Sequence, residues 1–244
     1  MQKIFTSVII LSVATIASAC LKIATTFILT YIAIQPDVDF AVYDGIAIGS
    51  DYLWSAIMLV AFVGYIIYWV NLKRMRSALP MPYKAGFGKI MTGVVLFSAG
   101  IFIVVIPASL FVGANEYIIK GYEISIVIAA AIEMLGLSYM ISGFSKLATM
   151  SSASMMMRQG FSMLKLAAIV LTVGMGLSLT LTCAQTFIIK LHEMVSVYTV
   201  MQMVNTFGIQ PIKLVGMVVL IVGWAKVKNA SISEERNTEF QGAI

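Results

Sequence analysis

The hydrophobic positions of this chain fall into long, nearly unbroken runs that are separated by short polar connections. A helix needs about 20 apolar residues to cross the hydrocarbon core of a bilayer. We predict a transmembrane helix in each of six runs: 4–34, 52–71, 90–112, 124–144, 166–189 and 211–226. The sequence therefore predicts an all-α integral membrane protein, a polytopic bundle of about six transmembrane helices within residues 1–228.

The first apolar run, 4–34, is longer than one span requires and is interrupted by a single charge, Lys22. Its start, a short basic segment before an apolar stretch that ends in Ala17-Ser18-Ala19-Cys20, also fits a cleavable signal peptide. Cleavage before Cys20 would leave about 15 apolar residues, too few to cross a bilayer. We therefore expect a retained helix that is tilted or protrudes from the membrane.

The last apolar run is short, and its surroundings decide where the helix begins. Pro211 suits the first turn of a helix, and Asn205 and Gly208 mark a break before it. Polar residues interrupt the preceding segment, 191–207, which we expect to lie in the interface or to re-enter the membrane without crossing it. The polar residues 229–244 are expected to form a cytoplasmic tail.

Lysine and arginine gather on alternate connections of the predicted bundle. If Lys3 is cytoplasmic, the inner segments hold twelve Lys or Arg and the outer segments hold three, which are Lys120, Lys190 and Lys213. This positive-inside bias predicts that the N-terminus and the C-terminus are both cytoplasmic. The first outer loop is expected to contain four acidic residues, which are Asp37, Asp39, Asp44 and Asp51. It also contains Gly45 and Gly49, which match the G-x-x-x-G pattern outside any predicted span.

Composition excludes several classes of protein. Hydrophobic residues make up 60% of the chain and charged residues 11%, so no soluble domain of ordinary size remains beside the bundle. The net charge of +5 comes from basic residues scattered over loops, which is not the patch expected for a nucleic-acid partner. A single histidine, His192, and two cysteines in apolar runs, Cys20 and Cys183, provide no recognisable metal or haem site, and we expect no cofactor.

Two ionisable residues, Lys22 and Glu133, lie near the middle of predicted spans at matching depths. Such groups are rare in membranes because burying a charge costs several kcal/mol, and they are functional candidates by default. One interpretation is a buried ion pair that fixes how the helices pack, and another is a proton or cation relay. In a third, Lys22 extends toward the outer interface and Glu133 is protonated.

The fifth predicted span carries small residues at four-residue spacing on one face: Thr172, Gly176, Thr180 and Ala184. Small residues let two helices approach closely, so this face is expected to be a helix packing seam. The alternative is a polar stripe that lines a pathway. In the connection before this span, a run of three methionines at 155–157 offers a surface that adapts to partners.

No catalytic, cofactor-binding or metal-binding motif accompanies these features, and we do not expect an enzyme. The leading interpretation is a non-enzymatic subunit of a larger membrane assembly, such as a secretion, conjugation or translocation apparatus, in the inner membrane of a bacterium. Its partners would be lipid and other membrane subunits or copies of itself. The alternative is a small transporter or channel that uses Glu133 and Lys22 as coupling groups. A transporter predicts a cavity that touches Glu133, whereas a subunit predicts a dry interior, and an enzyme predicts a cleft around His192.

Overall fold

The computed structural model describes residues 2–33, 40–110, 116–187, 200–201 and 203–242. Its long helices are α1 (Gln2–Ala33), α2 (Phe40–Ala78), α3 (Met81–Leu110), α4 (Glu116–Ala148), α5 (Met155–Phe187) and α7 (Gln210–Gly242), and a π-helix, η1 (Val204–Ile209), precedes the last. Six helical stretches are long and apolar enough to cross a membrane, and the described residues contain no strand. This architecture confirms the predicted six-helix, all-α bundle and fits a multi-pass membrane protein.

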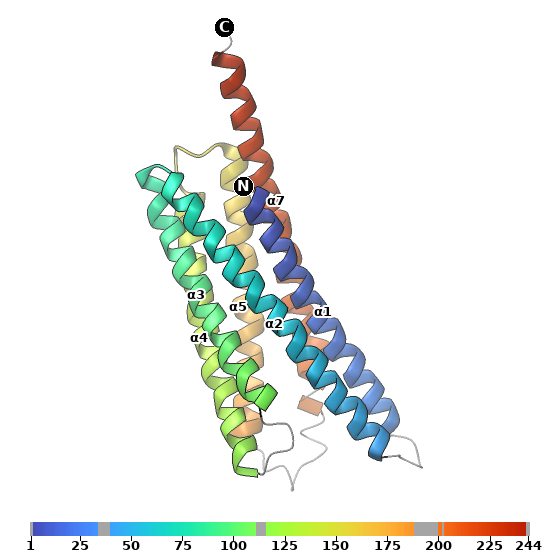
Figure 1. Ribbon diagram of the computed structural model, residues 1–244. Helices are drawn as coiled ribbons and strands as arrows, with labels where there is room; N and C mark the ends of the chain where they lie inside the picture. The colour runs from blue at the N-terminus through green and yellow to red at the C-terminus, as the bar shows by residue number, and fades with distance from the viewer. Residues whose placement is uncertain (1, 34–39, 111–115, 188–199, 202, 243–244) are drawn as a thin grey trace.

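The six long helices form a closed ring. Each packs against its neighbour in the sequence, and α7 packs against α1 to complete the circle. Figure 1 shows that the helices run alternately up and down, with both ends of the chain and the α2–α3 and α4–α5 connections at one end of the bundle. We refer to this as the terminal end, and to the opposite one as the distal end.

The helices extend beyond the predicted spans. The largest difference is in α2, which begins at Phe40, so that Asp44, Gly45, Gly49 and Asp51 are helical and do not lie in a loop. The chain has no proline between Pro36 and Pro80, and nothing interrupts the backbone hydrogen bonds of this helix once it has formed. Likewise, the methionines at 155–157 form the first turn of α5. Ser154 caps that turn by accepting a hydrogen bond from the Met157 N–H at 3.3 Å.

The α-helix α7 begins at Gln210, one residue before Pro211, but Pro211 does not mark the start of helical structure. Helical structure begins upstream in η1 and continues into α7, and the candidate span covers Val204–Ser233. Pro211 has no N–H, and its ring crowds the preceding turn, so a regular α-helix cannot pass through it undisturbed. The wider π turn relieves that conflict, and the Gln210 N–H donates to the Asn205 carbonyl five residues earlier.

The remaining predictions for this part of the chain are tested only in part. Most of the predicted interfacial segment, 191–207, including His192 and Glu193, lies outside the described residues. Its last four residues, 204–207, belong to η1 and to a candidate span. Helix α7 continues to Gly242, so most of the predicted polar tail, 229–244, is helical.

Helices α3 and α4 touch through small residues that recur every seven positions. The series are Gly86, Gly93 and Gly100 on α3 and Ala129, Gly136 and Gly143 on α4. They pair in antiparallel order: a Cβ added at Gly136 would lie 2.6 Å from the Gly93 carbonyl oxygen, and one at Gly143 would lie 2.7 Å from that of Gly86. Seven residues make about two helical turns, so each series stays on one face. The two backbones are in direct contact along this face.

Helices α5 and α7 repeat the arrangement with their own series, Gly160, Ala167 and Gly174 on α5 and Gly216, Gly223 and Ala230 on α7. A Cβ added at Gly160 would lie 3.2 Å from the Gly223 carbonyl oxygen, and one at Gly216 would lie 2.7 Å from Leu171 Cγ. We call these two contacts the glycine seams. They join four of the six helices into two tight pairs.

Large side chains fill the terminal end. Trp224 is almost fully buried and meets Tyr68 and Phe144 edge to face, with ring centroids 5.9 and 6.3 Å apart. The distal end differs, because no described residue of α1 after Ala19, and none of α2 before Ser55, is buried. In Figure 1, α1 and α2 accordingly lean away from α3 and α4 toward that end.

Candidate functional site: a central polar cavity

A cavity of about 230 Å³ lies inside the ring, between the packed terminal end and the open distal end. All six long helices contribute to its wall. Three charged residues line it, Lys22 from α1, Glu133 from α4 and Lys213 from α7, together with Ser18, Ser178, Thr182 and Gln210. A space of this size with several polar partners has room for water or for a small solute.

Glu133 is the buried acid of this cavity, with 9% of its surface exposed. Its side chain lies directly over Gly100 of α3, at the end of the α3–α4 glycine seam. A Cβ added at Gly100 would collide with Glu133 Cγ and lie 3.1 Å from Oε1. Glycine at this position therefore makes the space that the Glu133 carboxylate occupies.

Lys213 occupies the corresponding place at the end of the other seam. Its stem lies over Gly174 of α5, where an added Cβ would be 3.0 Å from Lys213 Cγ. The lysine is half-buried and interacts electrostatically with Glu133. Lys213 was counted among the outer basic residues, but it lies well inside the candidate span, which begins at Val204.

Lys22 lies on the other side of the cavity against α2. Its Nζ is 4.5 Å from the centroid of the Trp54 ring, a cation–π contact, and Asp51 attracts it electrostatically. Lys22 also interacts with Lys213, and the two like charges repel. Lys22 and Glu133, the two candidates from the sequence, both line this cavity, but the cation that interacts electrostatically with Glu133 is Lys213. Among the described residues Glu133 forms no ion pair within 4 Å with either lysine.

The π-helix η1 is tied to both sides of the ring at the distal edge of the cavity. Thr206 Oγ1 is 3.3 Å from Thr26 Oγ1 of α1, and Ser178 Oγ of α5 donates to Asn205 Oδ1 at 3.3 Å. Gln210, which follows η1, is buried and lines the cavity. Segments of π-helix inside α-helices often occur at functional sites.

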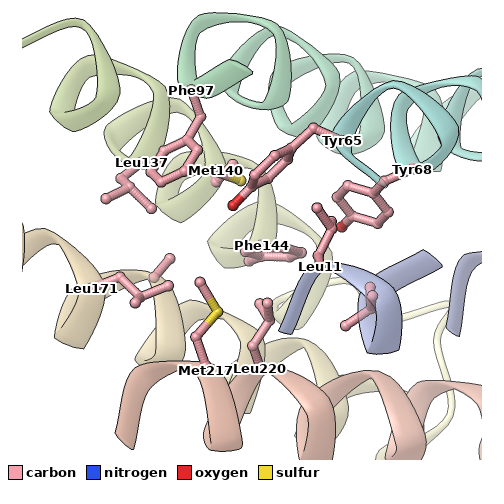
Figure 2. Close-up of a pocket in the computed structure, with 12 residues that line it drawn as sticks. Leu11, Tyr65, Tyr68, Phe97, Leu137, Met140, Phe144, Leu171, Met217 and Leu220 are labelled. Atoms are coloured by element: carbon pink, nitrogen blue, oxygen red, sulfur yellow. The ribbon is translucent and has the colours of Figure 1, made fainter. Parts of the chain in front are cut away.

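An apolar layer closes the cavity toward the terminal end. Figure 2 shows a second pocket in which Tyr65 and Tyr68 of α2 and Phe97 of α3 approach Leu171 of α5 and Met217 of α7. It measures about 30 Å³, enough for about one water molecule, and it shares Tyr65, Phe97 and Met217 with the polar cavity. The rings of Tyr65 and Phe97 are 5.2 Å apart. We call these rings the aromatic layer: Tyr65, Tyr68, Phe97, Phe144 and Trp224.

The predicted seam on α5 lies beside the site. Thr172 and Thr180 donate to backbone oxygens of their own helix, those of Ala168 at 2.7 Å and Gly176 at 2.9 Å. A Cβ added at Gly176 would meet only Met134 Cε, at an ordinary 3.5 Å, and Ala184 is half-buried. Gly160 of α5, by contrast, lies against the backbone of α7, where an added Cβ would be 3.2 Å from the Gly223 carbonyl oxygen.

Sequence reasoning missed three parts of the site: Lys213, Gly100 and Gly174. The seven-residue recurrence of glycine and alanine in four helices was the available signal for the two glycines. Beginning the last span at Val204 instead of Pro211 would have moved Lys213 from the first turn of that span to its interior.

Comparison of the chain with protein-family models, with curated proteins and with solved structures finds no match. Within the part of the chain that the structure describes, no group of three or more His, Cys, Asp or Glu residues is placed to hold a metal ion. The chemistry on which a function can be argued is therefore that of the cavity: two amines, one carboxylate and several hydroxyl and amide groups.

Proposed function

We propose that this protein is a small multi-pass membrane transporter whose central cavity binds a small solute that carries a negative charge. The observation that carries the proposal is the cavity itself, to which every long helix contributes and where Lys22, Lys213 and Glu133 meet. Charged groups inside a membrane bundle are costly and usually mark a pathway for a solute or an ion. Transport requires no chemical conversion, and we accordingly propose that the protein is not an enzyme.

The charges of the cavity favour an anion. Two amines and one carboxylate line the cavity, the amines repel each other, and Asp51 attracts Lys22 from outside the lining. A solute with one negative charge between Lys22 and Lys213 would balance the charges of the lining residues and remove the repulsion. In a medium of low dielectric constant this gain is larger than it is in water. A cationic solute would instead add a third positive charge.

We propose that the bundle lies in the inner membrane of a bacterium with both ends in the cytoplasm. The positive-inside bias supports this orientation, and it becomes stronger once Lys213 is counted within a span, because only Lys120 and Lys190 remain among the basic residues expected outside. The aromatic layer then lies between the cavity and the cytoplasm.

The packing suggests which parts move. The glycine seams hold α3 with α4 and α5 with α7, so each pair is expected to move as a unit. The aromatic layer is instead built across the joints of the ring, with Tyr65 and Tyr68 on α2 against Phe97 on α3 and Trp224 on α7. Rocking of the α1–α2 hairpin against the other four helices would part these rings and open the cavity inward.

The test is flux through the purified protein in proteoliposomes, measured with a panel of small carboxylates, inorganic anions and matched cations. We expect uptake of at least one anion, and its loss in Lys213→Met and Glu133→Gln. Lys146→Met is the matched control, because Lys146 is an exposed lysine of α4 outside the cavity. Uptake of a cation with no anion uptake, or equal loss in the control, would contradict the proposal.

A subunit of a larger membrane assembly is the second candidate, and one observation favours it. Gly45 and Gly49 of α2 are exposed, and no atom lies within 4 Å of a Cβ added at either. This G-x-x-x-G face is open to a helix of another chain or of a second copy. Gentle extraction followed by sizing and identification of co-purifying proteins tests this. A stable partner that is lost in Gly45→Leu would support a subunit, and a monomer that transports on its own would exclude it.

A further inference from the structure

A groove of about 280 Å³ runs between α2 and α3 on the outer surface of the terminal end. Its walls are of two kinds. Arg76 and Gly88 form one end, near the α2–α3 turn, and Met91, Val95 and Leu96 continue it along α3 with Trp69 on the α2 side. From Gly88 to Leu96 the helix rises about 12 Å toward the middle of the bundle. The groove therefore joins a charged mouth to an apolar channel.

The mouth of the groove is strongly basic. Five basic residues lie on the two helices around the turn: Lys73, Arg74, Arg76, Lys84 and Lys89. The chain has no Asp or Glu from residue 52 to residue 115, so no acid on either helix neutralises them within this stretch. Lys89 donates to Ser142 of α4 at 2.7 Å, and Lys146, further along the same helix, adds another cation at this end. The local charge thus attracts an anion.

Arg76 is oriented for a phosphate. Its Nε donates to the Lys84 carbonyl oxygen at 3.2 Å, which fixes the plane of the guanidinium. The group lies over Gly88, with its atoms 3.7 Å from where a Cβ would be, so no side chain of α3 covers it there. Within the described residues Nε is the only guanidinium nitrogen with a hydrogen bond, which leaves both terminal amino groups for two parallel bonds to phosphate oxygens.

Trp69 marks the depth of the groove. It is half-buried, and the Lys73 Nζ lies 5.4 Å from the centroid of its ring. Arg76 lies beside Gly88 and Tyr65 beside Phe97, so on these antiparallel helices Trp69 is level with about Val95, at the deep end of the groove. Lys73 lies between Trp69 and Arg76 along α2, which places a second cation beside the mouth.

We infer that this groove is a binding site for an anionic phospholipid. The phosphate binds Arg76 with Lys73 beside it, and one acyl chain lies along Met91, Val95 and Leu96. A free phosphate would use the mouth alone, whereas a lipid matches both the charge and the apolar continuation. The site is separate from the central cavity and does not depend on the transport proposal.

Native mass spectrometry of the full chain in detergent tests the site, with dioleoyl phosphatidylglycerol and dioleoyl phosphatidylcholine added in parallel. We expect phosphatidylglycerol to bind about tenfold more tightly, a difference of about 1.4 kcal/mol. Arg76→Gln should remove this preference, and Arg158→Gln should keep it, because Arg158 is exposed on α5 and does not line the groove. Thr92→Trp, which fills the channel without changing any charge, should reduce binding of phosphatidylglycerol by a similar factor.

Three outcomes would overturn the inference. The first is equal binding of the two lipids to the unaltered chain. The second is an equal loss of preference in Arg158→Gln and Arg76→Gln, which would indicate a diffuse charge effect. The third is binding of inorganic phosphate at Arg76 with no lipid preference, which would make the site an anion site only. If Arg76→Gln does not fold, Arg76→Lys replaces it, because lysine keeps the charge and lacks the paired donors. A lipid preference of Arg76→Lys equal to that of the unaltered chain would then contradict the inference.

Discussion

The terminal and distal halves of the bundle are built from the same six helices and have opposite interiors. In the terminal half, glycines at seven-residue spacing bring backbones into contact, and aromatic side chains around Trp224 fill the centre. In the distal half the helices separate, and the centre is a polar cavity. The change occurs at Gly100 and Gly174, the last glycines of their series. There the nearest side-chain group to each glycine is the stem of a charged residue, Glu133 at Gly100 and Lys213 at Gly174, although the Ala129 carbonyl oxygen also lies close to Gly100.

On α5 and α7, the positions that would continue each series explain why the contact stops. They are Leu181 on α5 and Ile209 at the start of the last span. Both are larger than glycine or alanine, so the two backbones cannot approach there as they do at the terminal end. The cavity therefore begins where the small-residue series end, and the following predictions test this relation.

The largest effect is expected from Gly93→Leu in the middle of the α3–α4 seam. A Cβ at Gly93 would overlap the Gly136 carbonyl and lie 2.6 Å from Met140 Cγ, so the helices must separate. We expect a loss of about 3 kcal/mol or more in the free energy of unfolding. Equilibrium unfolding in mixed detergent micelles measures this. Gly45→Leu is the control, because no described atom lies within 4 Å of a Cβ added at this exposed glycine. It should change the free energy of unfolding by less than about 0.5 kcal/mol.

Removing one charge of the cavity should have the next largest effect. Lys213→Met leaves the buried Glu133 without the cation that interacts with it, and we expect a loss of roughly 2 to 3 kcal/mol in the same unfolding assay. The double variant Lys213→Met with Glu133→Gln should recover much of the loss. Recovery of stability in the double variant Lys22→Met with Glu133→Gln would instead identify Lys22 as the partner of Glu133, which is the ion pair considered from the sequence.

A smaller effect is expected from Gly100→Ala, which displaces the Glu133 side chain. The flexible stem can rotate away, but the added Cβ would also lie 2.8 Å from the Ala129 carbonyl oxygen, so α3 and α4 must separate slightly. The free energy of unfolding should fall by about 1 to 2 kcal/mol. Flux should fall much more, because the carboxylate moves out of the cavity. Gly176→Ala is the matched control on α5, since its added methyl meets only Met134 at an ordinary distance. An equal fall of flux in both variants would show that the position of Glu133 does not matter.

The last prediction concerns orientation and involves no change in stability. With Cys20 and Cys183 replaced by serine, single cysteines at Ser77 and Ser233 should resist an impermeant thiol reagent in intact cells, and one at Ala41 should react. All three positions are exposed on the protein surface, so a difference in labelling reports the side of the membrane and not burial. Labelling of the first two with protection of the third would reverse the proposed topology.

Several features of this protein follow from the sequence alone. The number of helices follows from apolar runs of about 20 residues, because the thickness of a bilayer sets a minimum length that is easy to count. The positions of Lys22 and Glu133 in the interior follow equally simply, since each is an isolated charge in an apolar run. Helix ends were predicted less well, because a helix that already forms its own hydrogen bonds continues past the apolar segment until a proline or a turn ends it. For α2 this end came at Pro80.

Only the tertiary structure decided which residues meet in the cavity. Lys213 seemed to lie outside because Pro211 has the properties of a first-turn residue, and the π turn that carries the helix past it depends on where η1 and α7 pack. The placement of Glu133 and Lys213 in one cavity, and the contact of Lys22 with Trp54, depend on closing the ring and on the two glycines that make room for the charged stems. Depth in the membrane is a property of one helix and can be read along it. The neighbour at that depth is set by how six helices rotate against one another, which is decided by contacts between distant parts of the chain.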